Sequence, residues 1–154
     1  MNAKEYDSTI DTLTHIKRVN ELMVEFAQEI LRRAVVHDES KLHSPEKEGF
    51  DEFTPKLKNS EYGSPEYKAF LSGLKESLTH HYQHNSHHPE HYAKGVNEMD
   101  LYDLVEMILD WKAAGERHTT GSIFKSLEVN GPRFNIQSQL IEIVSNHAKR
   151  EGWQ

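Results

Sequence analysis

Apolar residues that recur every three or four positions constrain the fold of this chain more than any other feature of the sequence. The longest such run extends from Ser8 to about Ala34, and shorter runs with the same spacing follow it. This spacing places apolar side chains on one face of an amphipathic helix. No segment alternates polar and apolar residues with a sustained period of two, as a half-buried strand would. The sequence therefore predicts an all-α fold, a helical bundle of five to six helices.

Capping residues and prolines predict where the expected helices begin. Pro45 and Pro65 each follow a serine and suit the first position of a helix, and Asp100 is a good N-terminal cap. The expected helices cover residues 8–34, 45–58, 65–84, 101–118 and 135–150. We expect loops at residues 58–63 and at residues 121–134, the second with one helical turn.

Length and composition limit the classes of function. A chain of 154 residues fits one domain, residues 1–154, with no internal repeat. The absence of cysteine excludes disulfides and thiolate metal sites, which leaves His, Asp and Glu as the strong metal ligands. The sequence contains no signal-peptide core and no membrane span, so a soluble, cytoplasmic protein is expected. A net charge of -7 argues against broad attachment to nucleic acid or to an anionic membrane.

Histidine is the most unusual part of the composition. Six of the 11 histidines lie between residues 80 and 91. His37 and Asp38 follow the end of the first apolar run, and a neutral nitrogen donor beside an anionic oxygen donor is half of a metal site. His15 lies on the apolar face of the same run, where a core histidine is the simplest interpretation. Asp110 lies beside the apolar ridge of the 101–118 helix.

Taken in order, His15, His37-Asp38 and Asp110 resemble the HD superfamily of metal-dependent phosphohydrolases. The segment Thr14-His-Ile-Lys-Arg-Val19 is similar to the helix that carries the first histidine of that family, and His37-Asp-Glu-Ser-Lys41 is similar to its His-Asp-x-x-Lys signature. The resemblance covers residues 12–115, and residues 120–154 form a C-terminal loop and helix. The run from His80 to Tyr92 also resembles a group of small uncharacterised phage and bacterial proteins.

The resemblance implies an HD-like helical bundle in which His15, His37, Asp38 and Asp110 bind a divalent ion. Some branches of the family add histidines for a second ion, and the pairs His80-His81 and His87-His88 resemble that arrangement. The Gly-Tyr-Pro motif of the best-known two-metal branch is absent here, so the choice of extra ligands among the histidines of residues 80–91 stays open. One or two ions of Mn, Fe, Co, Ni, Zn or Mg are expected.

The leading function hypothesis is hydrolysis of a phosphoester in a nucleotide or a related small molecule by metal-activated water. Asp38 would bind metal and orient the nucleophile, Lys41 would contact phosphate, and a histidine such as His81 would protonate the leaving oxygen. Weaker candidates for phosphate contacts are Arg18, Lys112, Arg117 and Arg133.

Two alternatives remain open at this point. Some HD-like proteins hold two irons and oxidise a small polar substrate with dioxygen. A non-catalytic module that sequesters a nucleotide is the other alternative. A homodimer is compatible with a small helical domain that has aromatic residues near its ends.

Overall fold

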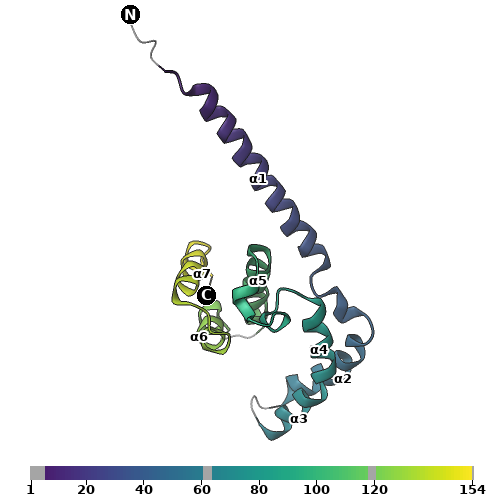
Figure 1. Cartoon of the computed structure of the whole chain (residues 1–154). Coiled ribbons are helices and arrows are strands. Elements are labelled where there is room, and N and C mark those ends of the chain that lie inside the picture. Colours follow the sequence, from purple (N-terminus) through teal and green to yellow (C-terminus); the bar gives the residue numbers. More distant parts are fainter. Residues whose placement is uncertain (1–5, 61–63, 118–120, 154) are drawn as a thin grey trace, which may run out of the picture. The chain divides into compact units, whose positions relative to one another are not determined.

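The computed structural model describes residues 6–60, 64–117 and 121–153 (Figure 1). All regular structure within these residues is helical, which confirms the all-α prediction. The α-helices are α1 (Thr9–Val36), α2 (Glu46–Asn59), α3 (Pro65–Gly73), α4 (Lys75–His84), α5 (Leu101–Glu116), α6 (Ile123–Arg133) and α7 (Ser138–Arg150). Three 3-10 turns join them: η1 (Glu39–Leu42), η2 (Pro89–His91) and η3 (Gly95–Glu98). None of the described helices has the length and apolar composition needed to cross a membrane.

The chain divides into two compact units, Met1–His37 and Asp38–Gln154. In the first, α1 is the one helix among the described residues, and taken by itself this helix buries none of its residues. When this unit is taken by itself, Ile10 and Leu13 on its apolar face are exposed, as is His15. Arg18 pairs with Glu21 on the same helix at 3.0 Å.

In the second unit, α2 packs against α3, α4 and η1, while α6 packs against both α5 and α7. The apolar core of the α5–α7 group contains Met107, Ile123, Leu127, Val144 and Ala148. Each lies on the inward stripe of its helix, in agreement with the spacing of three and four residues that predicts these helices.

The expectation of a loop over residues 121–134 is wrong for its larger part, because residues 123–133 form α6. The hydroxyl oxygen of Ser122 accepts a hydrogen bond from the Phe124 N–H and caps this helix. Gly131, which suggests a loop in the sequence, is buried, and a Cβ there would lie 3.1 Å from the Ile141 side chain. The glycine therefore permits close helix packing, and Pro132 is accommodated near the end of α6.

The helix expected over residues 65–84 ends where α4 ends, but it is divided into α3 and α4 at Leu74. Gly73 ends α3, and a Cβ at this position would lie 2.3 Å from the Phe53 ring of α2. This close approach of α2 accompanies the break. The last helix begins at Ser138 rather than at Asn135, whose backbone is left-handed with a φ of 50°. Residues 61–63 of the expected loop, and His118 at the expected end of the fourth helix, lie outside the described residues.

Candidate metal centre

The second unit gathers its histidines around the start of η1 and the end of α4. His81 lies on the last turns of α4, and His87 and His88 lie in the turn between α4 and η2. Asp38 precedes η1 with a left-handed backbone, at a φ of 57°. A non-glycine residue in this region is uncommon, although Asp adopts it more readily than most. The chain thus turns sharply at the residue that supplies the carboxylate.

One oxygen and three ring nitrogens converge at this place. Asp38 Oδ1 lies 3.2 Å from His81 Nε2 and 3.5 Å from His87 Nε2. His81 Nε2 lies 2.9 Å from His88 Nε2. One ligand atom from each of the four residues lies within 4.8 Å of the other three. We call Asp38, His81, His87 and His88 the four-residue cluster.

Carboxylates anchor the opposite sides of two of these rings. His81 Nδ1–H donates to Glu46 Oε2 at 2.8 Å, and both residues are fully buried, with exposures of 1% and 0%. His87 Nδ1 lies 3.2 Å from Glu106 Oε1. An ionised carboxylate only accepts hydrogen bonds, so Nδ1 of each ring carries the proton. The Nε2 atom that faces Asp38 is then the atom available to a metal ion.

The pKa values of the cluster follow from burial and from these partners. Burial alone would raise the pKa of Asp38, but hydrogen bonds from His81, His87 and Lys41 outweigh it and hold that pKa well below its ordinary value. Burial alone would lower the pKa of His87, but its contacts with Asp38 and Glu106 outweigh burial and raise that pKa to about 9. Burial and the nearby positive charges of His87, His81 and Lys41 lower the pKa of His88 to about 3. The lowered pKa favours the neutral form of His88, the form that can bind a metal ion.

This arrangement fits a divalent cation. Ligand atoms about 2.1 Å from a tetrahedral ion lie about 3.4 Å from one another, close to the separations in the cluster. With Nδ1–H directed at Glu46, His81 Nε2 faces the Asp38 carboxylate at 3.2 Å, and either a proton or a metal ion can lie between these two atoms. An Asp110 carboxylate oxygen lies within 4.8 Å of one from Asp38, so further negative charge is near. Metal binding would displace the His87 proton.

The remaining histidines of residues 80–91 have other partners. His80 Nδ1–H donates to Glu46 Oε1 at 2.8 Å, and its ring stacks on His84. The Nδ1 atoms of His84 and His91 donate to the backbone carbonyls of His80 and Tyr82, each at 2.8 Å. The structure thus places His81, His87 and His88 together and leaves His80 outside the four-residue cluster.

Two of the expected ligands belong to the first unit. His15 lies on the second turn of α1, and His37 directly follows the last residue of this helix. Both stay predictions that rest on the resemblance, and the four-residue cluster is complete within the second unit without them.

The expected phosphate contacts lie in different surroundings. Lys41 Nζ donates to Asp38 Oδ2 at 2.6 Å, so it contacts the carboxylate oxygen that does not face the histidines. Arg133 pairs with Glu90 at 2.8 Å and lies over the Phe134 ring. It also contacts Tyr82, whose ring lies beside that of His88. Lys41 is thus in direct contact with the cluster, and Arg133 is linked to it through Tyr82.

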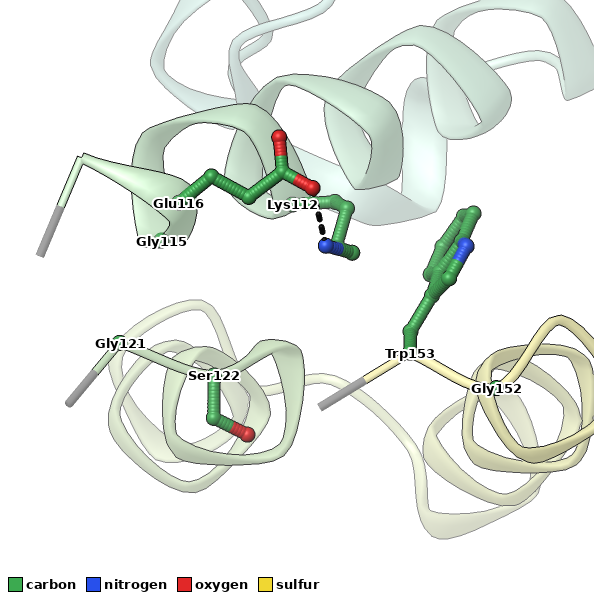
Figure 2. A pocket seen from close by; sticks show the side chains of 7 residues that line it. All are labelled: Lys112, Gly115, Glu116, Gly121, Ser122, Gly152 and Trp153. Carbon is green, nitrogen blue, oxygen red and sulfur yellow. Dashed lines mark hydrogen bonds and ion pairs between the residues drawn. The ribbon is translucent and has the colours of Figure 1, made fainter. Parts of the chain in front are cut away.

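Lys112 lies in a separate hollow of about 310 Å³ between the end of α5, the start of α6 and the residues that follow α7. Figure 2 shows its ammonium group joined to Glu116, with Trp153 on the other side. Its Nζ lies 5.7 Å from the centre of the Trp153 ring. No member of the four-residue cluster lines this hollow. Arg117 is exposed at the end of α5, and Arg18 lies on α1.

The sequence analysis did not identify Glu46 or Glu106. Glu46 lies in the first turn of α2, where acidic residues are common because they favour the positive end of the helix dipole. Glu106 lies on α5 between Val105 and Met107. Nothing in the sequence separates these two residues from other acidic residues on amphipathic helices, because their partners are distant along the chain.

Comparisons with known proteins give one match. No curated protein and no solved structure matches the chain. The model of a protein family, described as a family of unknown function (DUF5662), matches residues 4–150. This match includes α1, the four-residue cluster and all of α7. The chain therefore belongs to the DUF5662 family.

Proposed function

We propose that the chain binds a divalent transition-metal ion and hydrolyses a phosphoester in a nucleotide or a related small molecule. The observation that carries the proposal is the convergence of Asp38 Oδ1 with the Nε2 atoms of His81 and His87, while carboxylates anchor the far sides of both rings. Mixed nitrogen and oxygen ligands suit Mn, Fe, Co, Ni or Zn better than an all-oxygen Mg site. The resemblance adds His15, His37 and Asp110 to the ligands that we propose.

The chain's own residues suit this reaction. In hydrolysis, a water oxygen forms a bond to phosphorus, the bond between phosphorus and the leaving oxygen breaks, and a proton passes to that leaving oxygen. A divalent ion in the site would supply positive charge to the phosphoryl oxygens and lower the pKa of water. Lys41 would contact the phosphate, since its ammonium group lies beside Asp38. We assign His81 to metal binding rather than to proton transfer, because it is 1% exposed.

Elemental analysis of the untagged protein tests the metal centre first. We expect one or two equivalents of a transition metal in the wild-type protein, and a loss of metal in His81→Ala and in His87→Ala. His84→Ala is the matched control, because His84 lies on the same helix but donates to a backbone carbonyl. Absence of metal from the wild type after incubation with Mn, Fe, Co and Zn would overturn the proposal.

Activity assays then distinguish the functions. Release of inorganic phosphate from nucleotides, or of nitrophenol from nitrophenyl phosphoesters, should depend on added Mn, Co or Zn and should be lost in His87→Ala. Iron-dependent oxygen consumption without phosphoester cleavage would instead support an oxygenase. Tight nucleotide binding without turnover would support a sequestering module.

A further inference from the structure

We propose that Glu46 is a positioning residue that fixes the protonation of His81 and thereby the direction of its metal-binding nitrogen. This inference rests on the proposed metal centre. Glu46 lies outside the four-residue cluster and contacts it only through His81 among the hydrogen bonds described above. Its role is therefore to control a ligand without being one.

Both oxygens of the Glu46 carboxylate are engaged. Oε2 accepts from His81 Nδ1–H at 2.8 Å and from the Ser40 hydroxyl at 3.0 Å. Oε1 accepts from His80 Nδ1–H at 2.8 Å. A carboxylate that accepts hydrogen bonds at both oxygens cannot rotate without losing one of them. Glu46 is also 0% exposed, so water does not compete for these bonds.

A chain of donors sets the direction of each bond. The Asn85 side-chain amide donates to Ser40 Oγ at 2.8 Å, and the Ser40 hydroxyl in turn donates to Glu46. Asn85 also donates to the backbone carbonyl of His81 at 2.8 Å, which ties the end of α4 to η1. With the donors arranged in this order, the Glu46 carboxylate is left to accept from His81.

These hydrogen bonds determine which ring nitrogen of His81 can bind a metal ion. The Glu46 carboxylate holds one imidazole proton on Nδ1, so Nε2 is the nitrogen that can exchange its proton for a metal ion. Nε2 faces Asp38 Oδ1 at 3.2 Å. A carboxylate behind the ring also raises the basicity of the ligand nitrogen, and substitution of such a partner typically lowers metal affinity about 10- to 100-fold.

The first test measures Zn²⁺ affinity by competition with a chelating dye, with Zn²⁺ as the only added ligand. We expect Glu46→Ala to raise the Kd about 10- to 100-fold, and Glu46→Gln to raise it less, because the amide oxygen still accepts from one imidazole. Asp103→Asn is the matched control, since Asp103 is an equally buried carboxylate whose partners are hydroxyl groups. It should change the Kd by no more than about threefold.

The second test records the tautomer of His81 by two-bond proton–nitrogen NMR on the Zn²⁺-free, histidine-labelled protein. We expect Nδ1 of His81 to be protonated in the wild type and only partly protonated in Glu46→Ala, a change that mere loss of stability would not produce. An unchanged tautomer, with a Kd equal to that of Asp103→Asn, would overturn the role of Glu46.

If Glu46→Ala does not fold, the comparison of Glu46→Gln with Asp103→Asn decides the question in the same way, and equal Kd values would overturn the role. A wild-type protein that takes up no Zn²⁺ would overturn the metal centre itself. This outcome differs from one in which the wild type binds Zn²⁺ and the Glu46 variants bind it with the same Kd, which would overturn only the role of Glu46.

Discussion

Two buried carboxylates of the second unit are used in different ways. Glu46, with 0% exposure, accepts hydrogen bonds from two imidazoles. Asp103, with 2% exposure, accepts from the hydroxyls of Ser86 and Tyr92, each at 2.6 Å, and forms a capping box with Asp100 at the start of α5. Both ionised groups are satisfied inside the protein, as burial requires. The two carboxylates differ, however, in the chemistry of the groups that donate hydrogen bonds to them.

A hydroxyl that donates to a carboxylate can accept a further hydrogen bond but is a weak metal ligand, whereas an imidazole that does so presents a second nitrogen that can bind a metal ion. The Asp103 network therefore fastens the turn after α4 to the N-terminus of α5, and its effect is on the fold. The Glu46 network directs His81 Nε2 toward Asp38, and its effect extends to a site. Burial of a carboxylate alone does not indicate function; the chemistry of its donors does.

The largest expected effect is on metal binding in Asp38→Ala. Asp38 Oδ1 is the anionic member of the four-residue cluster, and its removal leaves three imidazoles that repel one another when protonated. We expect Zn²⁺ affinity to fall at least about 1000-fold, which is about 4 kcal/mol. Isothermal titration with Zn²⁺ measures this loss. Retention of one equivalent with a Kd within about tenfold of wild type would show that the cluster does not bind the ion.

The next effect is on stability in Asp103→Ala. This variant leaves two hydroxyls and the Asp100 N–H without their acceptor, and breaking a buried charged network costs about 3 kcal/mol. Urea unfolding of the metal-free protein should show this decrease in the free energy of unfolding. Zn²⁺ stoichiometry should stay at the wild-type value under folding conditions, and its loss would contradict the separation between the two carboxylates.

Much of the fold could be predicted from the sequence, because α1, α2 and α5 carry regular apolar stripes and Asp100 caps α5. The α6 helix was missed because Gly121 and the Asn130-Gly-Pro132 run suggest a loop. Tertiary packing overrides that local preference, since Ile123 and Leu127 are buried on this helix. The break at Leu74 could not be predicted either, because it depends on how closely α2 approaches Gly73.

The candidate site could be predicted only in part. Asp38, His81, His87 and His88 were identified by residue type and by the resemblance, and the structure brings them together. Glu46 could not be identified, because it lies 35 residues before His81 and its pairing depends on the packing of α2 against α4. Side-chain partners that are far apart in the sequence leave no local pattern.

A smaller effect is expected from Tyr92→Phe, which removes one hydroxyl from Asp103. A hydrogen bond to a charged group contributes about 1.5 kcal/mol or more, so the free energy of unfolding at pH 8 should fall by about this amount. Burial, followed by the hydrogen bond to Asp103, raises the pKa of Tyr92 from 10.0 to about 12.

The sign of the pH effect follows from this shift. The raised pKa favours the neutral phenol in the folded state, so the contribution of Tyr92 is complete below pH 10 and is lost as pH rises toward 12. The difference between wild type and Tyr92→Phe should therefore shrink between pH 8 and about pH 11, as measured by urea unfolding at both values. A constant difference would show that Tyr92 does not donate to Asp103.

The smallest effect is expected from Asp51→Asn on α2, the helix that also carries Glu46. Asp51 pairs with Lys47 at 2.6 Å, yet both side chains are more than half exposed, at 66% and 51%. Water solvates both charges in the unfolded and folded states, so the free energy of unfolding should change by less than about 0.5 kcal/mol, and less still in high salt. Zn²⁺ affinity should not change, because this carboxylate has no imidazole partner among its described contacts. A loss comparable with that of Glu46→Gln would mean that any acidic residue on α2 supports the site through its charge alone, and that the hydrogen bond to His81 is not the cause.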